Sequence, residues 1–247
     1  MKKKHILIFL AILLFFTASA YSQTVPKISL NVAPSNSPKD VAVALQILIL
    51  MTILSLAPSI LVLMTSFTRI SIVLSFVRKA VGTQSTPSNQ IVIALSLFLT
   101  FFVMAPVFKN INDNAFQPYL KGNLTNEQFY KKSITPLRNF MLKQTREKDL
   151  ALMIKSSKLE KPNSAEDLPL QVIVPAFAIS ELRIAFEMGF LIYLPFLMID
   201  MIVASILMSM GMMMLPPVLI SAPFKILLFV MVDGWYIVID ALVHSFH

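Results

Sequence analysis

Apolar residues form three long blocks along the chain, separated by shorter polar stretches. Residues 41–64 are almost wholly apolar and are interrupted once, by Pro58. A second block covers residues 91–108 and carries Pro106, and a third covers most of residues 170–246. Because a helix needs about 20 apolar residues to cross a bilayer, these blocks predict a protein that lies in or on a membrane.

Residues 1–20 predict a secretory signal peptide. Three lysines at positions 2–4 are followed by an apolar stretch at 6–16 and by small residues at 18–20. This is the order of the charged, apolar and cleavage regions of a signal peptide, and we expect cleavage after Ala20. A retained signal anchor is the alternative, although the apolar stretch is shorter than the roughly 20 residues that spanning requires.

The charges that flank the apolar blocks predict how the chain crosses the membrane. After cleavage, residues 21–40 form a polar leader outside the cytoplasm, rich in Pro, Ser and Asn. Between the first two blocks, residues 65–90 carry Arg69, Arg78 and Lys79. Short loops rich in Lys and Arg stay in the cytoplasm, so we expect this segment to be a short cytoplasmic connection.

Residues 109–169 form the only long polar insert, and they hold most of the acidic residues of the chain. Apolar residues recur in them at helical spacing, which predicts two or three amphipathic helices, one of them opened by Thr125. We expect the insert to lie in the periplasm, because long loops escape the charge rule that holds for short ones. We interpret it as a small solvated cap without chemistry of its own.

The third apolar block contains more helix breakers and charges than a simple membrane span. A charge at bilayer depth costs about 2.5–3.5 kcal/mol on insertion scales, so each must pair, face water or lie outside lipid. Arg183 and Glu187 are four residues apart and can pair on one helix face. Glu181 and Asp200 have no local partner, and we expect them to meet basic or polar groups on another helix or another subunit. The charged residues of the block are Glu181, Arg183, Glu187, Asp200, Lys225, Asp233 and Asp240.

Within this block, residues 200–217 hold an unusual cluster of methionines. Gly211 lies inside the cluster, and the pair Pro216–Pro217 follows it, so no regular helix is expected to run through this stretch. Methionine side chains are flexible and polarizable and can repack around a passing group, which favours a deformable constriction. The alternative is that they are ordinary core or lipid-facing side chains. The cluster consists of Met208, Met210, Met212, Met213 and Met214.

Composition excludes several classes of function. Hydrophobic residues make up 56% of the 247 residues, and the mean hydropathy is +0.74. The formal net charge is +8, but no patch of arginines interleaved with aromatic residues indicates nucleic-acid binding. There is no cysteine, and the three histidines lie near the termini, so thiol chemistry, disulfides and an internal histidine metal site are not expected. The sequence also lacks a His-Glu-x-x-His zinc motif, a Gly-x-Ser-x-Gly elbow and a phosphate-binding Walker loop.

Several short segments of residues 170–235 form a recognisable pattern. They are Pro175-Ala176-Phe177, Ser180-Glu181-Leu182, Ala185-Phe186, Gly189-Phe190, Leu194-Pro195-Phe196, Ile199-Asp200, Gly211 to Pro217, Pro223-Phe224-Lys225 and Asp233-Gly234-Trp235. With these segments the chain resembles the FliP family of type III secretion export-gate proteins, and residues 41–108 match the family more loosely. The flagellar branch of the family fits better than the injectisome branch, called SctR, which is the alternative.

The resemblance implies an all-α, membrane-associated fold of kinked helical hairpins with an inserted helical periplasmic domain. The hairpins would be residues 41–108 and 170–247, and the insert residues 109–169. Such a protein is not an enzyme and binds no cofactor. It forms a homo-oligomer, which we expect to be a pentamer, and assembles with FliQ-like and FliR-like subunits. FlhB-like and FlhA-like components, membrane lipids and unfolded flagellar proteins are the further partners, at the flagellar basal body in the bacterial inner membrane.

The resemblance also implies roles for individual residues. In this family a methionine gasket closes the pore, and by position it comprises Met210, Met212, Met213 and Met214. We expect Gly211, Pro216 and Pro217 to shape the gasket loop. A further hypothesis assigns intersubunit polar contacts to Glu181, Arg183, Glu187, Asp200 and Lys225.

Two interpretations from other classes stay open at this point. Broken helices with buried acidic residues also occur in secondary transporters, which are built from internal repeats. No second copy of the pattern at residues 200–217 occurs in the first half of the chain. An intramembrane aspartyl enzyme is not favoured, because Asp233-Gly234 has no second Gly-Asp pair to supply the partner carboxylate. The second open interpretation is a purely structural membrane anchor.

Overall fold

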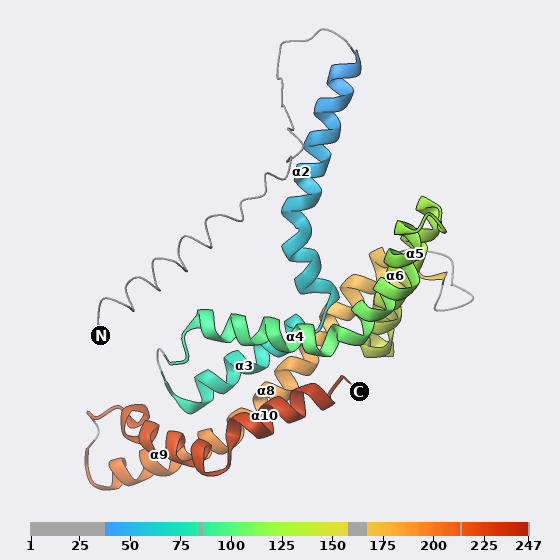
Figure 1. Cartoon of the computed structure of the whole chain (residues 1–247). Coiled ribbons are helices and arrows are strands. Elements are labelled where there is room, and N and C mark those ends of the chain that lie inside the picture. Colours follow the sequence, from blue (N-terminus) through green and yellow to red (C-terminus); the bar gives the residue numbers. More distant parts are fainter. Residues whose placement is uncertain (1–37, 84–85, 158–166, 213, 247) are drawn as a thin grey trace, which may run out of the picture. The chain divides into compact units, whose positions relative to one another are not determined.

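The computed structural model describes residues 38–83, 86–157, 167–212 and 214–246. It divides the chain into two compact units, residues 1–52 and residues 53–247, which we describe separately. The expected signal peptide and most of the expected leader lie outside the described residues. The described residues form helices joined by turns and contain no strand, which confirms the all-α prediction (Figure 1).

Helix α2 (Pro38–Met64) begins in the first unit and ends in the second. The predicted interruption at Pro58 is absent, because the helix continues through this residue. Proline is tolerated inside long apolar helices when neighbouring groups satisfy the freed backbone carbonyl. Proline also lies inside four later helices, at Pro106, Pro136, Pro175 with Pro195, and Pro223.

The expected short connection at residues 65–90 contains a helix, α3 (Phe67–Val81), so the prediction of a simple loop is wrong. Its placement on the cytoplasmic side stays a prediction. Its buried positions Ile70, Val73, Leu74 and Val77 follow the spacing i, i+3, i+4, i+7 of an amphipathic helix. With 15 residues, α3 is shorter than a spanning helix, so a search for long apolar runs misses it.

The second apolar block is longer than predicted. Helix α4 (Asn89–Ile111) continues through one π-helical turn, η1 (Asn112–Phe116), into α5 (Gln117–Leu120). The result is a helical stretch of 32 residues, Asn89–Leu120, long and apolar enough to cross a membrane. The predicted boundary at residue 108 therefore lies inside a continuous helix.

The polar insert contains α6 (Asn126–Gln144) and α7 (Glu147–Ser156), in agreement with the predicted amphipathic helices. Thr125 opens α6 as predicted: its hydroxyl accepts from the Gln128 amide at 3.3 Å, and the Gln128 side chain accepts from the Thr125 amide at 3.2 Å. This capping box satisfies two amides that would otherwise lack a partner. The insert does not stand apart, because Met141 shares a buried cluster with Val172, Ile173 and Phe177 of the following helix.

The last third forms α8 (Leu170–Ser209), α9 (Pro217–Met231) and α10 (Gly234–His244). Helix α8 has 40 residues and is the second helix that could cross a membrane alone. Helices α9 and α10 are bent by 64° at a short break and would count as a third span only together. The described residues therefore hold two or three helices capable of spanning a membrane.

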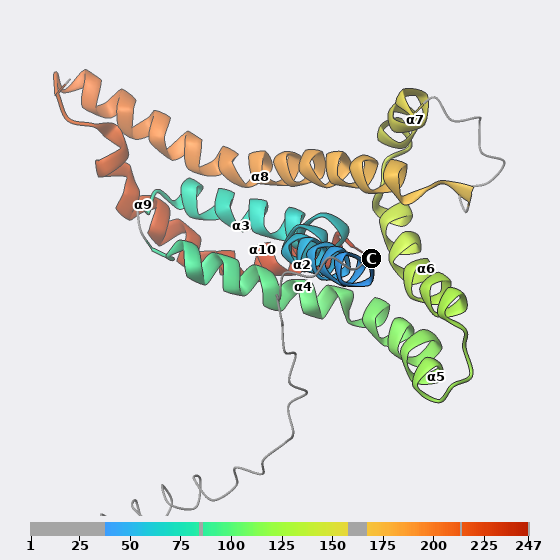
Figure 2. The same ribbon diagram turned by 90° about the horizontal axis from the view of Figure 1, so that it is seen from above.

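Helix α3 lies between α4 and α8 and forms the centre of the second unit (Figures 1 and 2). Its apolar stripe packs with Val92 of α4, Ala185 of α8 and Phe229 of α9 in one buried cluster. The approach to α8 is close, because a Cβ atom on Gly189 would lie 3.1 Å from Phe76 Cβ and closer still to its ring.

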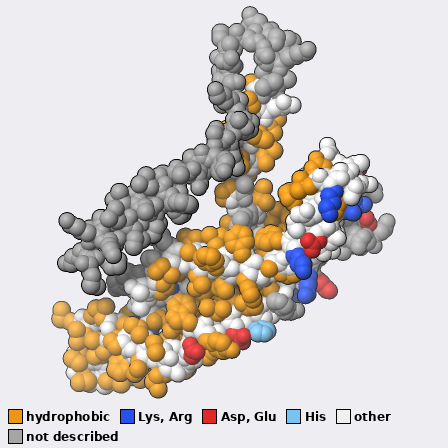
Figure 3. All heavy atoms as spheres, viewed as in Figure 1, with side chains coloured by type: hydrophobic (Ala, Val, Ile, Leu, Met, Phe, Trp, Pro, Cys, Tyr) orange, Lys and Arg blue, Asp and Glu red, His pale blue; other side chains and the backbone are white. Residues whose placement is uncertain are grey.

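The outer faces of these helices remain apolar. Figure 3 shows hydrophobic side chains over much of the surface of the described residues, whereas Lys and Arg gather mainly at the end that carries α5 and α6. On α8, Phe190 and Leu191 are 62% and 66% exposed. Such a surface is stable only against lipid or other protein chains.

Candidate functional site

The methionine loop, residues 210–215, joins the ends of α8 and α9. Helix α8 ends at Ser209, and Gly211 adopts the left-handed conformation with φ of +75°. The Met212 amide donates to the Leu207 carbonyl at 3.0 Å, and the Gly211 amide donates to the Met208 carbonyl at 3.1 Å. These two bonds form a Schellman motif, in which glycine favours the left-handed position. Gly211 therefore gives α8 a defined end, as the predicted loop-shaping role requires.

Pro216 and Pro217 determine where the next helix begins. Pro216 is the N-cap residue of α9, and Pro217 is its first residue. Proline is favoured there because its φ suits a helix and its missing N–H would have no helical partner. Rather than only ending the methionine run, the two prolines start the returning helix.

The methionine side chains of this loop differ in exposure. Met214 is 99% exposed, Met210 65% and Met212 37%, while Met213 lies outside the described residues. Met212 and Leu215 line a cavity of about 250 Å³ at the loop end of the hairpin. The loop therefore has a partly buried base and an exposed tip at Met214.

An ion pair joins the two helices that carry the loop. Lys225 of α9 donates from Nζ to Asp200 Oδ2 of α8 at 2.6 Å, and Ser221 donates to the other carboxylate oxygen. Lys225 is only 2% exposed. It also packs beside α3, because a Cβ atom on Gly82 would lie 3.7 Å from Lys225 Cδ. The pair thus fixes the hairpin of α8 and α9 and holds it against the end of α3.

A second polar cluster lies at Arg69 of α3, which is 1% exposed. Its guanidinium donates to both carboxylate oxygens of Glu181 on α8 and to Gln144 Oε1 at the end of α6. It also donates to the carbonyl and the hydroxyl oxygen of Ser245, and it lies 4.0 Å from the centre of the Phe246 ring. This cluster joins α3, α6, α8 and the segment after α10.

The remaining charged pair of α8 is exposed. Arg183 Nε donates to Glu187 Oε1 at 2.8 Å, as the spacing of four residues predicts, and both side chains are more than half exposed. The other charged residues predicted for α8 and α9 are each bonded inside the chain. The site is therefore an apolar loop on a braced hairpin, with one exposed ion pair on its long helix.

Comparison with known proteins shows which family has this arrangement. The sequence profile of the FliP family matches residues 50–242, which include every described helix except the first part of α2 and the end of α10. The chain belongs to the FliP family. Members of this family are structural components of a membrane-embedded export apparatus, so the prediction that the chain is not an enzyme is confirmed.

Three relatives, each named flagellar biosynthetic protein FliP, cover nearly the whole chain. The protein of Bacillus subtilis (strain 168) is 56% identical over 217 residues, which are 88% of this chain and 98% of the relative. That of Aquifex aeolicus (strain VF5) is 47% identical over 239 residues, 96% of this chain and 98% of the relative. That of Borreliella burgdorferi is 50% identical over 210 residues, which are 84% of this chain and 83% of the relative.

In this chain, Glu181, Asp200 and Lys225 find partners on other helices, whereas Arg183 and Glu187 pair with each other on α8. Of the two alternatives expected for Glu181 and Asp200, the structure shows a partner on another helix of the same chain. Their contact with other subunits stays a prediction, as does that of Arg183, Glu187 and Lys225.

Sequence reasoning missed several residues of the two polar clusters. In the sequence, Arg69 only helped to predict on which side of the membrane residues 65–90 lie. It directly precedes Ile70, the first residue of the apolar stripe of α3, and is buried with that stripe. Ser221 and Gln144 gave no signal, because a single serine or glutamine near a helix is common. Ser245 could not be anticipated, since its bonds join residues 176 positions apart.

Proposed function

We propose that this chain is a core subunit of the flagellar type III protein export gate. With FliQ-like and FliR-like subunits it forms the pore through which unfolded flagellar proteins pass. Met210, Met212, Met213 and Met214 form the gasket that closes this pore. The family match and the names of the relatives support the flagellar role, and the methionine loop supports the gasket.

The observation that carries this proposal is the exposure of Met214, at 99%, on a loop whose two ends are tightly held. An exposed apolar tip gains free energy when it is buried against other apolar groups. Loops from several copies that meet at one level would bury these tips against one another and exclude water. Thioether side chains can then yield to a passing polypeptide of any sequence.

The hairpin of α8 and α9 restrains both ends of the methionine loop. The Schellman motif at Gly211, the proline start of α9 and the buried bond between Lys225 and Asp200 act on both sides of it. A pore gate needs this combination, because a soft tip can close only if each copy presents it at the same height.

For contact between subunits, we place the polar contribution at Arg183 and Glu187. Both are exposed in the middle of α8, among exposed side chains that are mostly apolar, where lipid contact would be costly. Glu181, Asp200 and Lys225 support the same interface from inside, because each holds a helix in position.

The assembly follows from the same proposal. Several copies, a pentamer by expectation, surround the pore at the flagellar basal body in the inner membrane, with FlhB-like and FlhA-like components beside them. Residues 109–169 lie on the periplasmic side. The apolar helices of residues 41–120 and 170–247 carry the contacts with neighbours and with lipid.

Cysteine cross-linking tests the gasket directly, because the chain has no cysteine of its own. The variant Met214→Cys is co-expressed with FliQ-like and FliR-like partners, and the detergent-extracted complex is treated with a mild oxidant. We expect disulfide-linked dimers of this chain, since the tips of neighbouring copies meet. Single-particle imaging of the same complex locates residue 214 relative to the pore axis.

Met231→Cys is the matched control: it lies on the same hairpin, at the far end of α9, and its side chain is 76% exposed. We expect it to react with a soluble maleimide without forming dimers. Equal cross-linking of both variants, or none from Met214→Cys in an assembled complex, would contradict the gasket.

No observation favours the other functions considered. The three relatives are all named as flagellar proteins, which disfavours the injectisome branch. A transporter would need open acidic sites, whereas Glu181 and Asp200 are paired with Arg69 and Lys225.

A further inference from the structure

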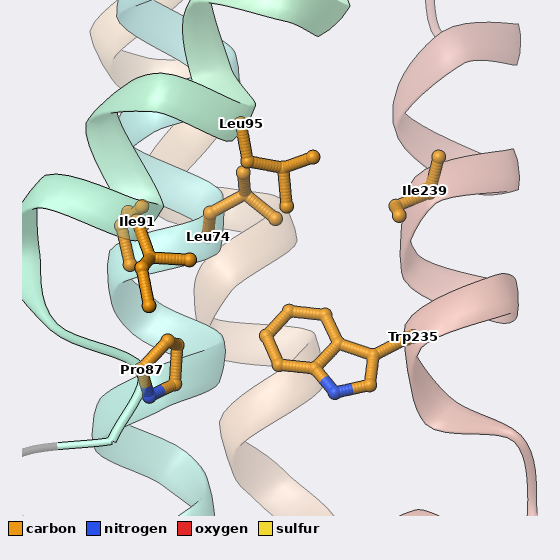
Figure 4. A pocket seen from close by; sticks show the side chains of 7 residues that line it. Leu74, Pro87, Ile91, Leu95, Trp235 and Ile239 are labelled. Carbon is orange, nitrogen blue, oxygen red and sulfur yellow. The ribbon is translucent and has the colours of Figure 1, made fainter. Parts of the chain in front are cut away.

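A cavity of about 250 Å³ lies between α4 and α10, and Leu74 of α3 contributes to its lining. Figure 4 shows its walls: Pro87, Ile91 and Leu95 on one side, and Trp235 and Ile239 of α10 on the other. All of its lining residues are apolar. It opens outward, because Ile91 and Trp235 are 57% and 37% exposed.

One end of this cavity is basic. Arg78, in the last turn of α3, donates from Nη1 to the carbonyl of Pro87 at 3.4 Å and to the Asn89 side chain. Pro87 lines the cavity, so its carbonyl connects the guanidinium of Arg78 to that end of the cavity. The exposed Lys79 follows Arg78 in the same turn.

These two cations have no acidic residue near them in the sequence. Between Asp40 and Asp113 the chain contains no Asp or Glu. In the part of the chain that the structure describes, the bonds of the Arg78 side chain come from Nη1, so the hydrogens on Nε and Nη2 can serve an anion.

We propose that this cavity and Arg78 with Lys79 form a binding site for an anionic phospholipid. One acyl chain occupies the apolar cavity between α4 and α10. The phosphate group is held by Arg78 and Lys79 at the Pro87 end. Basic pockets between membrane helices bind anionic headgroups in this way, and the cytoplasmic leaflet in which we expect residues 65–90 supplies such lipids.

The chemistry of the cavity favours a lipid over a helix of another subunit. Its lining is apolar throughout, and Pro87 at one end accepts a hydrogen bond from Arg78 through its carbonyl. A flexible hydrocarbon chain fits a narrow apolar space, and only a lipid joins it to a phosphate at the adjacent basic end.

The chain carries its own probe for this site, because Trp235 is its single tryptophan and lines the cavity. The purified full chain is reconstituted in phosphatidylcholine vesicles that contain increasing fractions of lipid with brominated acyl chains. Bromine quenches tryptophan fluorescence on contact. We expect brominated phosphatidylglycerol to quench Trp235 at several-fold lower mole fraction than brominated phosphatidylcholine.

Variants assign this preference to the basic end. In Arg78→Gln/Lys79→Gln, the preference for the anionic lipid should fall by at least about five-fold, since each basic residue near a membrane contributes about that factor. Lys109→Gln, at the opposite end of α4, is the matched control and should leave the preference unchanged. If the double variant is not incorporated, Lys79→Gln alone, at an exposed side chain, should still lower it measurably.

Three results would overturn the proposal. The first is equal quenching of the wild-type chain by both lipids, and the second is an unchanged preference in the variants of Arg78 and Lys79. The third is quenching that falls as the protein-to-lipid ratio rises, which would show that a second copy of the chain, and not a lipid, covers Trp235.

Discussion

Arg69 and Glu181 form a two-bond ion pair across 112 residues of sequence, between α3 and α8. The remaining donors of the guanidinium are bonded to Gln144 and Ser245, so all five of its N–H groups have a partner. Gln144 in turn donates to the Phe246 carbonyl at 2.9 Å. One buried arginine therefore holds together segments from both ends of the second unit.

The first prediction concerns the removal of this arginine. Arg69→Met keeps an unbranched aliphatic side chain but removes the guanidinium, which leaves Glu181 buried without its charged partner. Breaking a buried ion pair from one side costs about 3–5 kcal/mol, and we expect a loss of this size in the free energy of unfolding. Chemical denaturation of the purified chain in detergent, followed by circular dichroism, measures it.

Arg183→Met is the matched control for this experiment. Its ion pair with Glu187 is exposed, and exposed pairs contribute about 0–1 kcal/mol. The substitution is the same and the helix is the one that carries Glu181. A similar loss from both variants would show that the Arg69 cluster does not stabilise the fold specifically.

The second prediction concerns the brace of the methionine hairpin. Asp200→Asn and Lys225→Met should each destabilise the chain, because each leaves a poorly exposed charge without its counter-charge. The double variant should cost less than the sum of the two, with a coupling energy within about 0.5–3 kcal/mol. Unfolding measurements on the four proteins of this cycle give the coupling. Strict additivity would mean that the two side chains do not act together.

The sequence made this second pair foreseeable and the first one not. Asp200 lies nine positions before the end of α8 at Ser209, and Lys225 lies eight positions after the start of α9 at Pro217. In an antiparallel hairpin these residues lie at about the same level, so the position of the Pro-Pro pair makes Lys225 a candidate partner of Asp200. The sequence alone predicts only a basic or polar partner on another helix or another subunit. Arg69 and Glu181 meet only through the packing of α3 on α8, which local periodicity does not specify.

Some features of the fold can likewise be predicted from the sequence, and others cannot. The long apolar helices and the helix that begins after Thr125 follow from spacing and length, whereas the all-α class is implied by the resemblance to the FliP family. Helix α3 escapes a search for long apolar runs because it is short, although its apolar stripe is regular. The continuation of α4 to Leu120 is hidden because polar residues of the π-helical turn, Asn112 to Asn114, resemble the start of a loop. In both cases helical periodicity carries more information than mean hydropathy.

The third prediction concerns the end of α8. Gly211→Ala forces an L-residue into the left-handed conformation, which costs about 1–2 kcal/mol. Gly211→Asn should cost less, because asparagine visits this region more readily. Since a Cβ atom at this position would meet nothing within 4 Å, the difference reports conformation rather than a clash. Swimming motility in soft agar and unfolding in detergent should rank the variants glycine, asparagine, alanine. Equal effects of asparagine and alanine would count against the Schellman end.

The fourth prediction separates softness from bulk in the methionine loop. Replacing Met210, Met212 and Met214 together by alanine removes apolar volume from the exposed tip. We expect a higher ion conductance through the assembled complex in planar bilayers, because less side chain remains to exclude water from the pore. The same three positions changed to leucine keep the volume and lose most of the flexibility.

The leucine variant is therefore the informative control. It should hold conductance near that of the wild type but slow the export of flagellar subunits, measured as hook and filament protein in the culture medium. Alanine should raise leakage. If leucine exports as fast as methionine, the thioether contributes only volume, and if alanine leaves conductance unchanged, the loop does not seal the pore.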